Sequence, residues 1–295
     1  MALTDKLTAI ANAIRDKTGS AETMTLDAMA TEISNIQIGG SEKTEPYVEE
    51  TYDSSGNLIG AKLVGQSFIR DGMFYQSSKL ANVSIPSDIT KIGQYSFDSC
   101  SSLTSIDLPS TITFIASNAF NGCSKLTLTS LPRSLRAIGS SAFYNCKLLA
   151  LTSLPSEITS IGSFAFYNCE QLALTNLPAG IEIIDQYDFY NCKSLALTSL
   201  PSELTKIGDY AFYNCPLISI DRIPSKINSL TVCAFHSCTG LTSITFEGTP
   251  GFISSSVFNN CYNLTTINVP WAEGAVANAP WGATKATINY NYVES

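Results

Sequence analysis

Residues 143–166 read FYNCKLLALTSLPSEITSIGSFAF, and the phenylalanine that opens this stretch returns 23 residues later. The same spacing holds without insertion or deletion through nine phenylalanines: Phe74, Phe97, Phe120, Phe143, Phe166, Phe189, Phe212, Phe235 and Phe258. Cysteine follows three residues after eight of them, and Ser77 takes that position in the first copy. Self-similarity at this period predicts a solenoid, in which each copy buries its apolar residues only against its neighbours.

The order of residues within one copy predicts where its strand begins and ends. Leu149, Leu151 and Leu154 precede Pro155, and proline lacks the backbone donor that a strand interior needs. The leucine segment is therefore expected to form the strand. The segment after the proline, with Ile161 and Gly162, is expected to return the chain to the next copy.

This pattern resembles the bacterial leucine-rich repeats of the BspA-like type, also called the Treponema pallidum type. The blocks that carry the resemblance are Leu-x-x-Ile-x-Ile-Pro, Ile-Gly and Ala-Phe-x-x-Cys, the last of them seen at Ala142-Phe143 and Cys146. The resemblance implies an α/β-type solenoid of about nine 23-residue repeats with a parallel sheet on its concave side. It also implies a non-enzymatic surface adhesin or binding protein.

The sequence outside the repeats predicts four further segments. Residues 1–38 keep helical spacing at Leu7, Ile10 and Ile14 and are expected to form a helical hairpin, an attachment module that could also self-associate. Residues 39–45 have linker composition, and residues 46–72 are expected to form a β-hairpin N-cap around the turn at 54–57. The solenoid spans 73–270, and 271–295 is the expected C-terminal cap.

Both ends carry a second resemblance. Residues 3–36 resemble the helical leader of tail-associated proteins in phages and prophages of Gram-positive gut bacteria, and the C-terminal segment resembles the terminal segment of repeat proteins in those genomes. The resemblance implies a phage tail component as one possible setting. Trp271 and Trp281 are expected to cover the last core layer rather than to bind carbohydrate.

Charge and composition bound the partners and the location. The net charge of −8 argues against binding to nucleic acid. The sequence contains no run of 18 apolar residues, so insertion into a membrane is not expected. Residues 1–16 show no Sec signal, which predicts cytoplasmic synthesis without Sec export. An extracellular, cell-surface or virion-associated location is favoured. The cysteines are expected to be small buried hydrophobes with free thiols, although neighbouring copies would bring them within reach of a disulfide.

Five middle copies depart from the others. The apolar strand residue at Val83, Ile106, Ile244 and Ile267 becomes polar there, and the preceding position becomes Leu128, Leu151, Leu174, Leu197 or Ile220. One hypothesis places these side chains on the surface as an apolar stripe that binds a partner. The favoured alternative is a local bulge that keeps one apolar residue per copy in the core, worth about 1.5–3 kcal/mol each.

Two rows of side chains are the candidate binding residues. A short, almost uncharged row is expected to face outward from the strands, and its middle members are Ser130, Ser153, Asn176, Ser199 and Arg222. It suits a protein or glycan ligand, or serves solubility alone. A second row is aromatic and comprises Tyr144, Tyr167, Tyr190 and Tyr213. It suits an interface, or packs only on itself.

No catalytic residue, metal site or cofactor is expected. His236 is the single histidine and occupies the tyrosine position of its copy, so repeat drift explains it better than a Cys/His pair with Cys238 does. The leading prediction is a binding protein attached through its N-terminal helices. The alternative is a structural spacer or tail-associated component without a ligand of its own.

Overall fold

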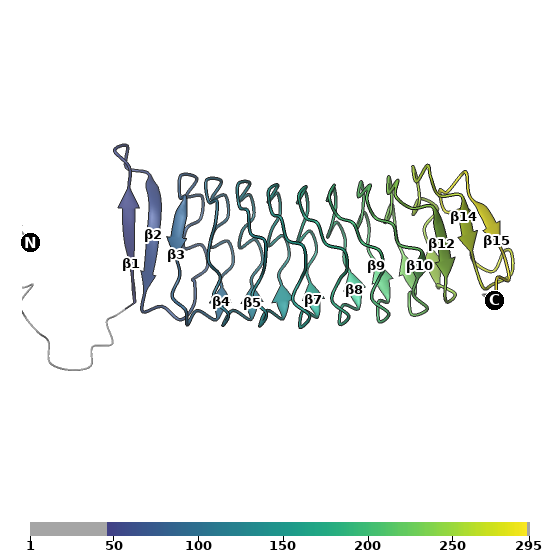
Figure 1. Ribbon diagram of the computed structural model, residues 1–295, viewed down its shortest axis with the longest axis horizontal. Coiled ribbons are helices and arrows are strands. Elements are labelled where there is room, and N and C mark those ends of the chain that lie inside the picture. Colours follow the sequence, from purple (N-terminus) through teal and green to yellow (C-terminus); the bar gives the residue numbers. More distant parts are fainter. Residues whose placement is uncertain (1–45, 294–295) are drawn as a thin grey trace, which may run out of the picture. The chain divides into compact units, whose positions relative to one another are not determined.

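Successive 23-residue copies stack along the long axis of the repeat region, one turn of chain per copy (Figure 1). The computed structural model describes residues 46–293. The predicted helical module at 1–38, the linker at 39–45 and the N-terminal likeness to phage tail proteins lie outside these residues. Within the described residues, the periodicity of the phenylalanines correctly predicts a parallel-stranded solenoid. The α/β class is wrong for these residues, because the repeats consist of strands and turns without a helix.

A β-hairpin covers the first turn of the solenoid. Strands β1 (Tyr47–Tyr52) and β2 (Leu58–Val64) are antiparallel, and the Asp53 carboxylate closes the turn by accepting the amide hydrogens of Ser55 and Asn57, each over 2.9 Å. β2 pairs in parallel with β3 (Asn82–Ser84), and Leu63 of β2 is buried in the core. The predicted β-hairpin cap is confirmed.

The most regular strands of the solenoid follow the proline position of the repeat. Each of them has two residues and ends on a buried aliphatic side chain. Four strands form one parallel sheet: β4 (Lys91–Ile92), β5 (Phe114–Ile115), β6 (Ala137–Ile138) and β7 (Ser160–Ile161). Four more form the next: β8 (Ile183–Ile184), β9 (Lys206–Ile207), β11 (Ser229–Leu230) and β13 (Phe252–Ile253). These segments were predicted as the return of the chain, and no strand was predicted in them.

The gap between β7 and β8 has a local cause at Asp188. In neighbouring copies the backbone amide after the strand donates a hydrogen bond to the preceding copy. Gly162 donates to the carbonyl of Ile138, and Gly208 donates to that of Ile184. The amide of Asp185 instead donates to Asp188 Oδ2 over 2.7 Å. A buried carboxylate therefore takes the donor that would join the two sheets.

The leucine segments form strands only towards the ends of the array. After β3, the strands on this side are β10 (Arg222–Ile223), β12 (Ser243–Phe246), β14 (Thr266–Asn268) and β15 (Thr287–Asn289), which form one parallel sheet. Described residues 93–113, 116–136, 139–159, 162–182, 185–205 and 208–221 lie between strands and contain none. The predicted continuous strand row is therefore wrong for copies two to six.

In the middle copies the displaced leucine turns towards the core. Leu151, Leu174 and Leu197 are fully buried, and Leu128 is half-buried against the same core. Ala196 and Thr198, two residues apart, donate to the carbonyls of Leu174 and Thr175, which are adjacent. Two residues opposite one is the arrangement of a β-bulge, and it is present between copies five and six. Because the leucines are buried or half-buried, the exposed apolar stripe is wrong.

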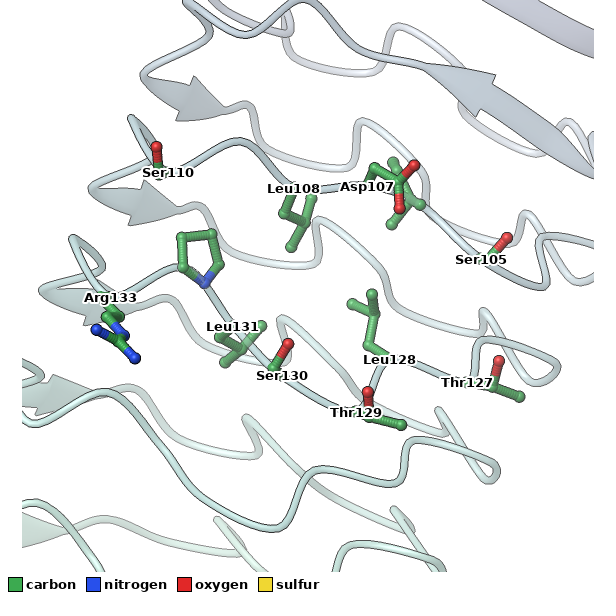
Figure 2. Close-up of a pocket in the computed structure, with 12 residues that line it drawn as sticks. Ser105, Asp107, Leu108, Ser110, Thr127, Leu128, Thr129, Ser130, Leu131 and Arg133 are labelled. Carbon is green, nitrogen blue, oxygen red and sulfur yellow. The ribbon is translucent and has the colours of Figure 1, made fainter.

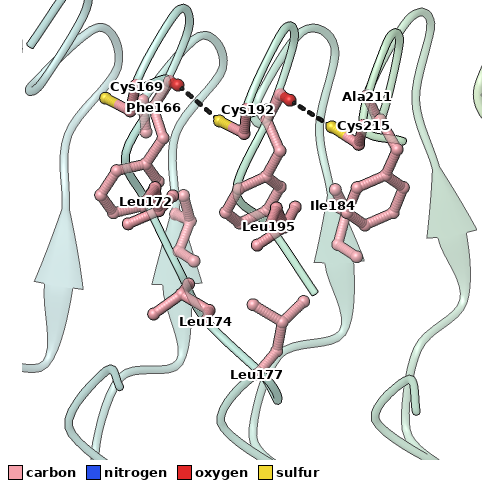
Figure 3. Packing of buried hydrophobic residues seen from close by; sticks show 14 of the residues in the cluster. Phe166, Cys169, Leu172, Leu174, Leu177, Ile184, Cys192, Leu195, Ala211 and Cys215 are labelled. Atoms are coloured by element: carbon pink, nitrogen blue, oxygen red, sulfur yellow. Dashed lines mark hydrogen bonds between the residues drawn. The ribbon is translucent and has the colours of Figure 1, made fainter. Parts of the chain in front are cut away.

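Phenylalanine and cysteine columns fill the core. Consecutive phenylalanine rings stack with centroids 5.1 Å apart at Phe97 and Phe120 and 5.8 Å apart at Phe235 and Phe258. Each column cysteine donates its thiol hydrogen to the phenylalanine carbonyl of the preceding copy, as Cys192 does to Phe166 over 3.1 Å (Figure 3). The eight column cysteines are buried and free, as predicted. Cys233 is the exception, because it lies outside the column and is half-exposed.

Two tryptophans close the far end of the solenoid. Trp281 is fully buried and Trp271 nearly so, and both rings contact Phe246. Trp281 also donates its indole hydrogen to the carbonyl of Ala277 over 2.8 Å. The capping interpretation is confirmed. Of the part of the chain that the structure describes, no helix is long and apolar enough to cross a membrane.

Candidate ligand-binding face

An open polar surface lies over the bulged copies. We call the exposed residues Thr129, Ser130, Thr152, Ser153, Thr175, Asn176, Thr198 and Ser199 the open face. None of their side chains forms a hydrogen bond within the described residues, and the backbone amides of Ser130, Ser153, Asn176 and Ser199 have no protein partner there either. The hydroxyls of this face and these four backbone amides are therefore free to bind water or a ligand, whereas the Thr198 amide donates to the Thr175 carbonyl.

The open face lies where the leucine segments form no strand. In copies eight and nine, by contrast, β12 and β14 pair through Ser243 with Thr266 and Thr245 with Asn268, so their main chain is occupied by the sheet. In copies three to six, where a leucine turns inward, that ladder is absent and the amides of Ser130, Ser153, Asn176 and Ser199 are unpaired within the described residues. The copies whose leucine fills the core thus also present hydrogen-bonding groups at the surface.

A groove of about 590 Å³ lies where the regular second copy meets the bulged third copy. Figure 2 shows Asp107 and Leu108 on one segment and Leu128, Thr129 and Ser130 on the next. Leu108 and Leu128 are half-buried and supply an apolar floor, while the hydroxyls lie along the exposed segment. A few polar groups around an apolar patch are the usual composition of a ligand site.

Charged residues bound the open face at its two ends, whereas its centre is neutral. Exposed Asp107 and Arg133 line the groove at one end. Asp221 and Arg222 lie at the other end, where Arg222 contacts the carboxylate of Glu247 over 3.6 Å. A ligand that covers the centre therefore meets hydroxyl, amide and main-chain groups rather than charge.

The predicted tyrosine row forms a stacked column that lies apart from the open face on each turn of the solenoid. Tyr144, Tyr167, Tyr190 and Tyr213 stack with centroids 4.5 to 4.7 Å apart and continue into His236. None of their ring contacts involves the open face, so the structure does not unite the two predicted rows. Because the faces of these rings cover one another, only their edges and hydroxyls remain available to a partner.

A second aromatic column lies beside the first. Phe164, Tyr187 and Tyr210 stack at 4.7 and 4.9 Å, and Tyr187 also lies 5.7 Å from Tyr190. The sequence analysis missed this column. Its signal was present as an aromatic residue two positions before the phenylalanine in three consecutive copies.

An asparagine ladder follows each tyrosine of the first column. The Asn168 side chain donates to the Asn145 carbonyl oxygen over 2.9 Å, and Asn191 donates to Asn168 over the same distance. These asparagines adopt left-handed backbone angles, with φ of 58° at Asn145 and 56° at Asn168. Asparagine tolerates that conformation better than most residues, which explains its recurrence at this turn.

The Cys/His pair considered for catalysis is not assembled. Cys238 is buried and donates its thiol hydrogen to the carbonyl of Phe212, and burial raises its pKa well above the ordinary value of 9.0. His236 Nδ1 lies 2.9 Å from Ser237 Oγ, and burial lowers the pKa of the imidazole. No group of three metal-ligating side chains occurs among residues 46–293.

The nine candidate binding residues thus fall into three places. Ser130 lines the groove, and Ser153, Asn176 and Ser199 continue the open face in the following copies. Arg222 lies on β10 at its far end. The four tyrosines form the stacked column. The groove residues Asp107, Leu108 and Arg133 could not be found from the repeat pattern, because the groove exists only where two backbone arrangements meet.

Comparison with known proteins supports the repeat assignment. A sequence model described as the BspA type leucine rich repeat region matches residues 67–195 and 159–275. A comparison with curated proteins found no match.

Several solved structures resemble the fold. A leucine-rich repeat protein from Bacteroides ovatus is 23% identical with a TM-score of 0.56, covering 83% of this chain and 75% of its own. The pneumococcal vaccine antigen PcpA is 18% identical with a TM-score of 0.54, covering 80% and 69%. The Treponema pallidum leucine rich repeat protein is 27% identical with a TM-score of 0.47, covering 58% and 88%.

Proposed function

Since the chain belongs to the family of BspA-type leucine-rich repeat proteins, we propose that it is a binding protein whose ligand lies on the open face and in the adjoining groove. Proteins with such repeats typically mediate protein binding or adhesion and are generally non-enzymatic. The observation that carries the proposal is the loss of sheet pairing in neighbouring copies, which leaves main-chain amides and hydroxyls together at one surface.

The proposed ligand is a protein loop or a glycan. Thr152, Ser153 and Asn176 offer donors and acceptors without charge, and the groove adds the apolar contact of Leu108 and Leu128. Loop backbones and sugars both present hydroxyl or amide groups that such a surface can match. We place the protein at a cell surface or on a virion.

The test is a binding screen with a matched pair of variants. The full chain is screened against immobilised host extracellular proteins and bacterial envelope glycans. Ser153→Arg with Ser199→Arg places two large cations on the open face, and Ser140→Arg with Ser255→Arg does the same at exposed serines elsewhere. We expect the first variant to lose binding at least tenfold and the second to bind as the unchanged protein does.

Two results would overturn this proposal. Equal binding by both variants would move the ligand away from the open face. A screen that returned no ligand at all would favour the structural spacer, in which the repeats only hold two ends apart.

A further inference from the structure

The two aromatic columns bring six phenols into one cluster, which we call the tyrosine cluster: Tyr144, Tyr167, Tyr187, Tyr190, Tyr210 and Tyr213. Within a column the rings are parallel to within 10° and 4.5 to 4.9 Å apart. Between columns, Tyr187 and Tyr190 are tilted by 46° at 5.7 Å, and Tyr210 and Tyr213 by 49° at 5.8 Å. All six side chains are half-buried, so small oxidants can reach the cluster while its rings stay in place.

Other tyrosines lack this geometry. Tyr75 and Tyr95 meet edge to face at 6.4 Å, and Tyr47, Tyr52 and Tyr262 are exposed and stack on no other tyrosine within the described residues. In each column of the cluster, neighbouring copies hold their phenol rings nearly parallel, with centroids 4.5 to 4.9 Å apart. The chain thus places its only close tyrosine pairs, among residues 46–293, on one surface.

We propose that the tyrosine cluster is a site of oxidative cross-linking, at which a one-electron oxidant such as a peroxidase with hydrogen peroxide joins tyrosines of neighbouring copies as dityrosine. Each phenol loses one electron and its hydroxyl proton, and the two radicals form one carbon–carbon bond between ring carbons next to the oxygens. The hydrogen on each of those carbons leaves as a proton while each oxygen regains one. The two electrons and two protons released in total convert one hydrogen peroxide to two waters.

The fold determines which products can form. Stacked partners within a column are 23 residues apart in the chain, whereas Tyr187 and Tyr190 are three apart. A bond between Tyr167 and Tyr190 therefore closes a covalent loop across one copy. Since such a loop restricts the unfolded chain, the cross-linked protein should unfold at a higher temperature. Asn168 and Asn191 are already joined by a hydrogen bond next to these tyrosines, so the two copies are held in register before the reaction.

Two triple variants test the proposal. Tyr167→Phe, Tyr187→Phe and Tyr213→Phe together break every close tyrosine pair of the cluster while keeping its rings, and Phe164 already shows that phenylalanine fits a column. Tyr47→Phe, Tyr52→Phe and Tyr262→Phe remove the same number of phenols outside it. Dilute full-length protein is treated with peroxidase and hydrogen peroxide, and dityrosine fluorescence is measured in the monomer fraction. Circular dichroism confirms that each variant is folded.

We expect the control variant to form intramolecular dityrosine as the unchanged protein does, and the cluster variant to lose most of it. Cleavage after glutamate at Glu170 and Glu182 places Tyr167 and Tyr190 on different peptides, so mass spectrometry should find these peptides joined. The proposal fails if the cluster variant retains the monomer signal, if the control loses it, or if the joined peptides carry tyrosines outside the cluster. None of these outcomes depends on a ligand of the open face.

Discussion

The buried carboxyl group of Asp188 destabilises the solenoid, and a single substitution should raise the free energy of unfolding. The side chain is completely buried, its Oδ2 takes the Asp185 amide that would otherwise join β7 to β8, and its Oδ1 has no hydrogen-bond partner. The same position holds alanine in five other copies, including Ala165 and Ala211 on either side. Leaving a buried polar atom unpaired costs about 1–3 kcal/mol, so Asp188→Ala should raise the free energy of unfolding by about that amount at neutral pH.

The gain should depend on pH in a defined direction. Burial raises the pKa of Asp188 well above its ordinary value of 3.8, so the folded protein retains a proton that the unfolded chain releases. The stability linked to this proton is complete below the ordinary value and is lost as the pH rises towards the folded value. The advantage of Asp188→Ala should therefore be smallest near the ordinary value and grow towards neutral pH.

Urea unfolding followed by far-ultraviolet circular dichroism at acidic and neutral pH measures this difference. Asp188→Asn is the matched control, because it keeps an acceptor for the Asp185 amide but cannot ionise. It should lose the pH dependence and gain less stability than Asp188→Ala. The reasoning is refuted if Asp188→Ala is less stable than the unchanged protein at neutral pH, or if its advantage is the same at both pH values.

Two further predictions concern the turns and the thiols. Asn168→Ala breaks two hydrogen bonds of the asparagine ladder and should lower the free energy of unfolding in urea by about 1–3 kcal/mol. Asn176→Ala in the same copy removes no hydrogen bond and should change that free energy by less than about 0.5 kcal/mol. Equal effects of the two substitutions would contradict a stabilising role of the ladder. Burial raises the pKa of the column thiols, to about 12 at Cys100 and at Cys261. A thiol-alkylating reagent should therefore modify only Cys233 in the folded protein and all nine cysteines in denaturant. Mass spectrometry counts the modified cysteines. Modification of several column cysteines without denaturant would show that the column is not closed to solvent.

The repeat pattern predicted the features that depend on spacing and size. A phenylalanine every 23 residues can lie only in a stacked core, and a cysteine at a fixed distance from it shares that core. The Ser54-Ser55-Gly56-Asn57 turn predicted the hairpin, and Trp271 and Trp281 predicted the closing layer. Each of these inferences needed only residue type and position.

Features that depend on competition between backbone partners were not predictable in this way. The proline in each copy marked the end of one segment, yet nothing in the sequence decided whether the leucines before it or the isoleucine after it would form the continuous sheet. The leucine displacement was visible, but its outcome depended on how much apolar volume the core could accept. The groove beside Ser130 follows from that outcome, and the interruption at Asp188 follows from one local hydrogen bond.

The proposed binding face requires that the amides of Ser153, Asn176 and Ser199 have no partner within the protein. Hydrogen exchange of the backbone amides tests this claim directly, because it reports each amide separately. The amides of Ser153, Asn176 and Ser199 should exchange rapidly, whereas those of Thr245 in β12 and Gly162 beside β7 should be protected, since they donate to the carbonyls of Asp221 and Ile138. Protection of Ser153, Asn176 and Ser199 equal to that of Thr245 would mean that the sheet continues through the middle copies, and the proposed binding face would not exist.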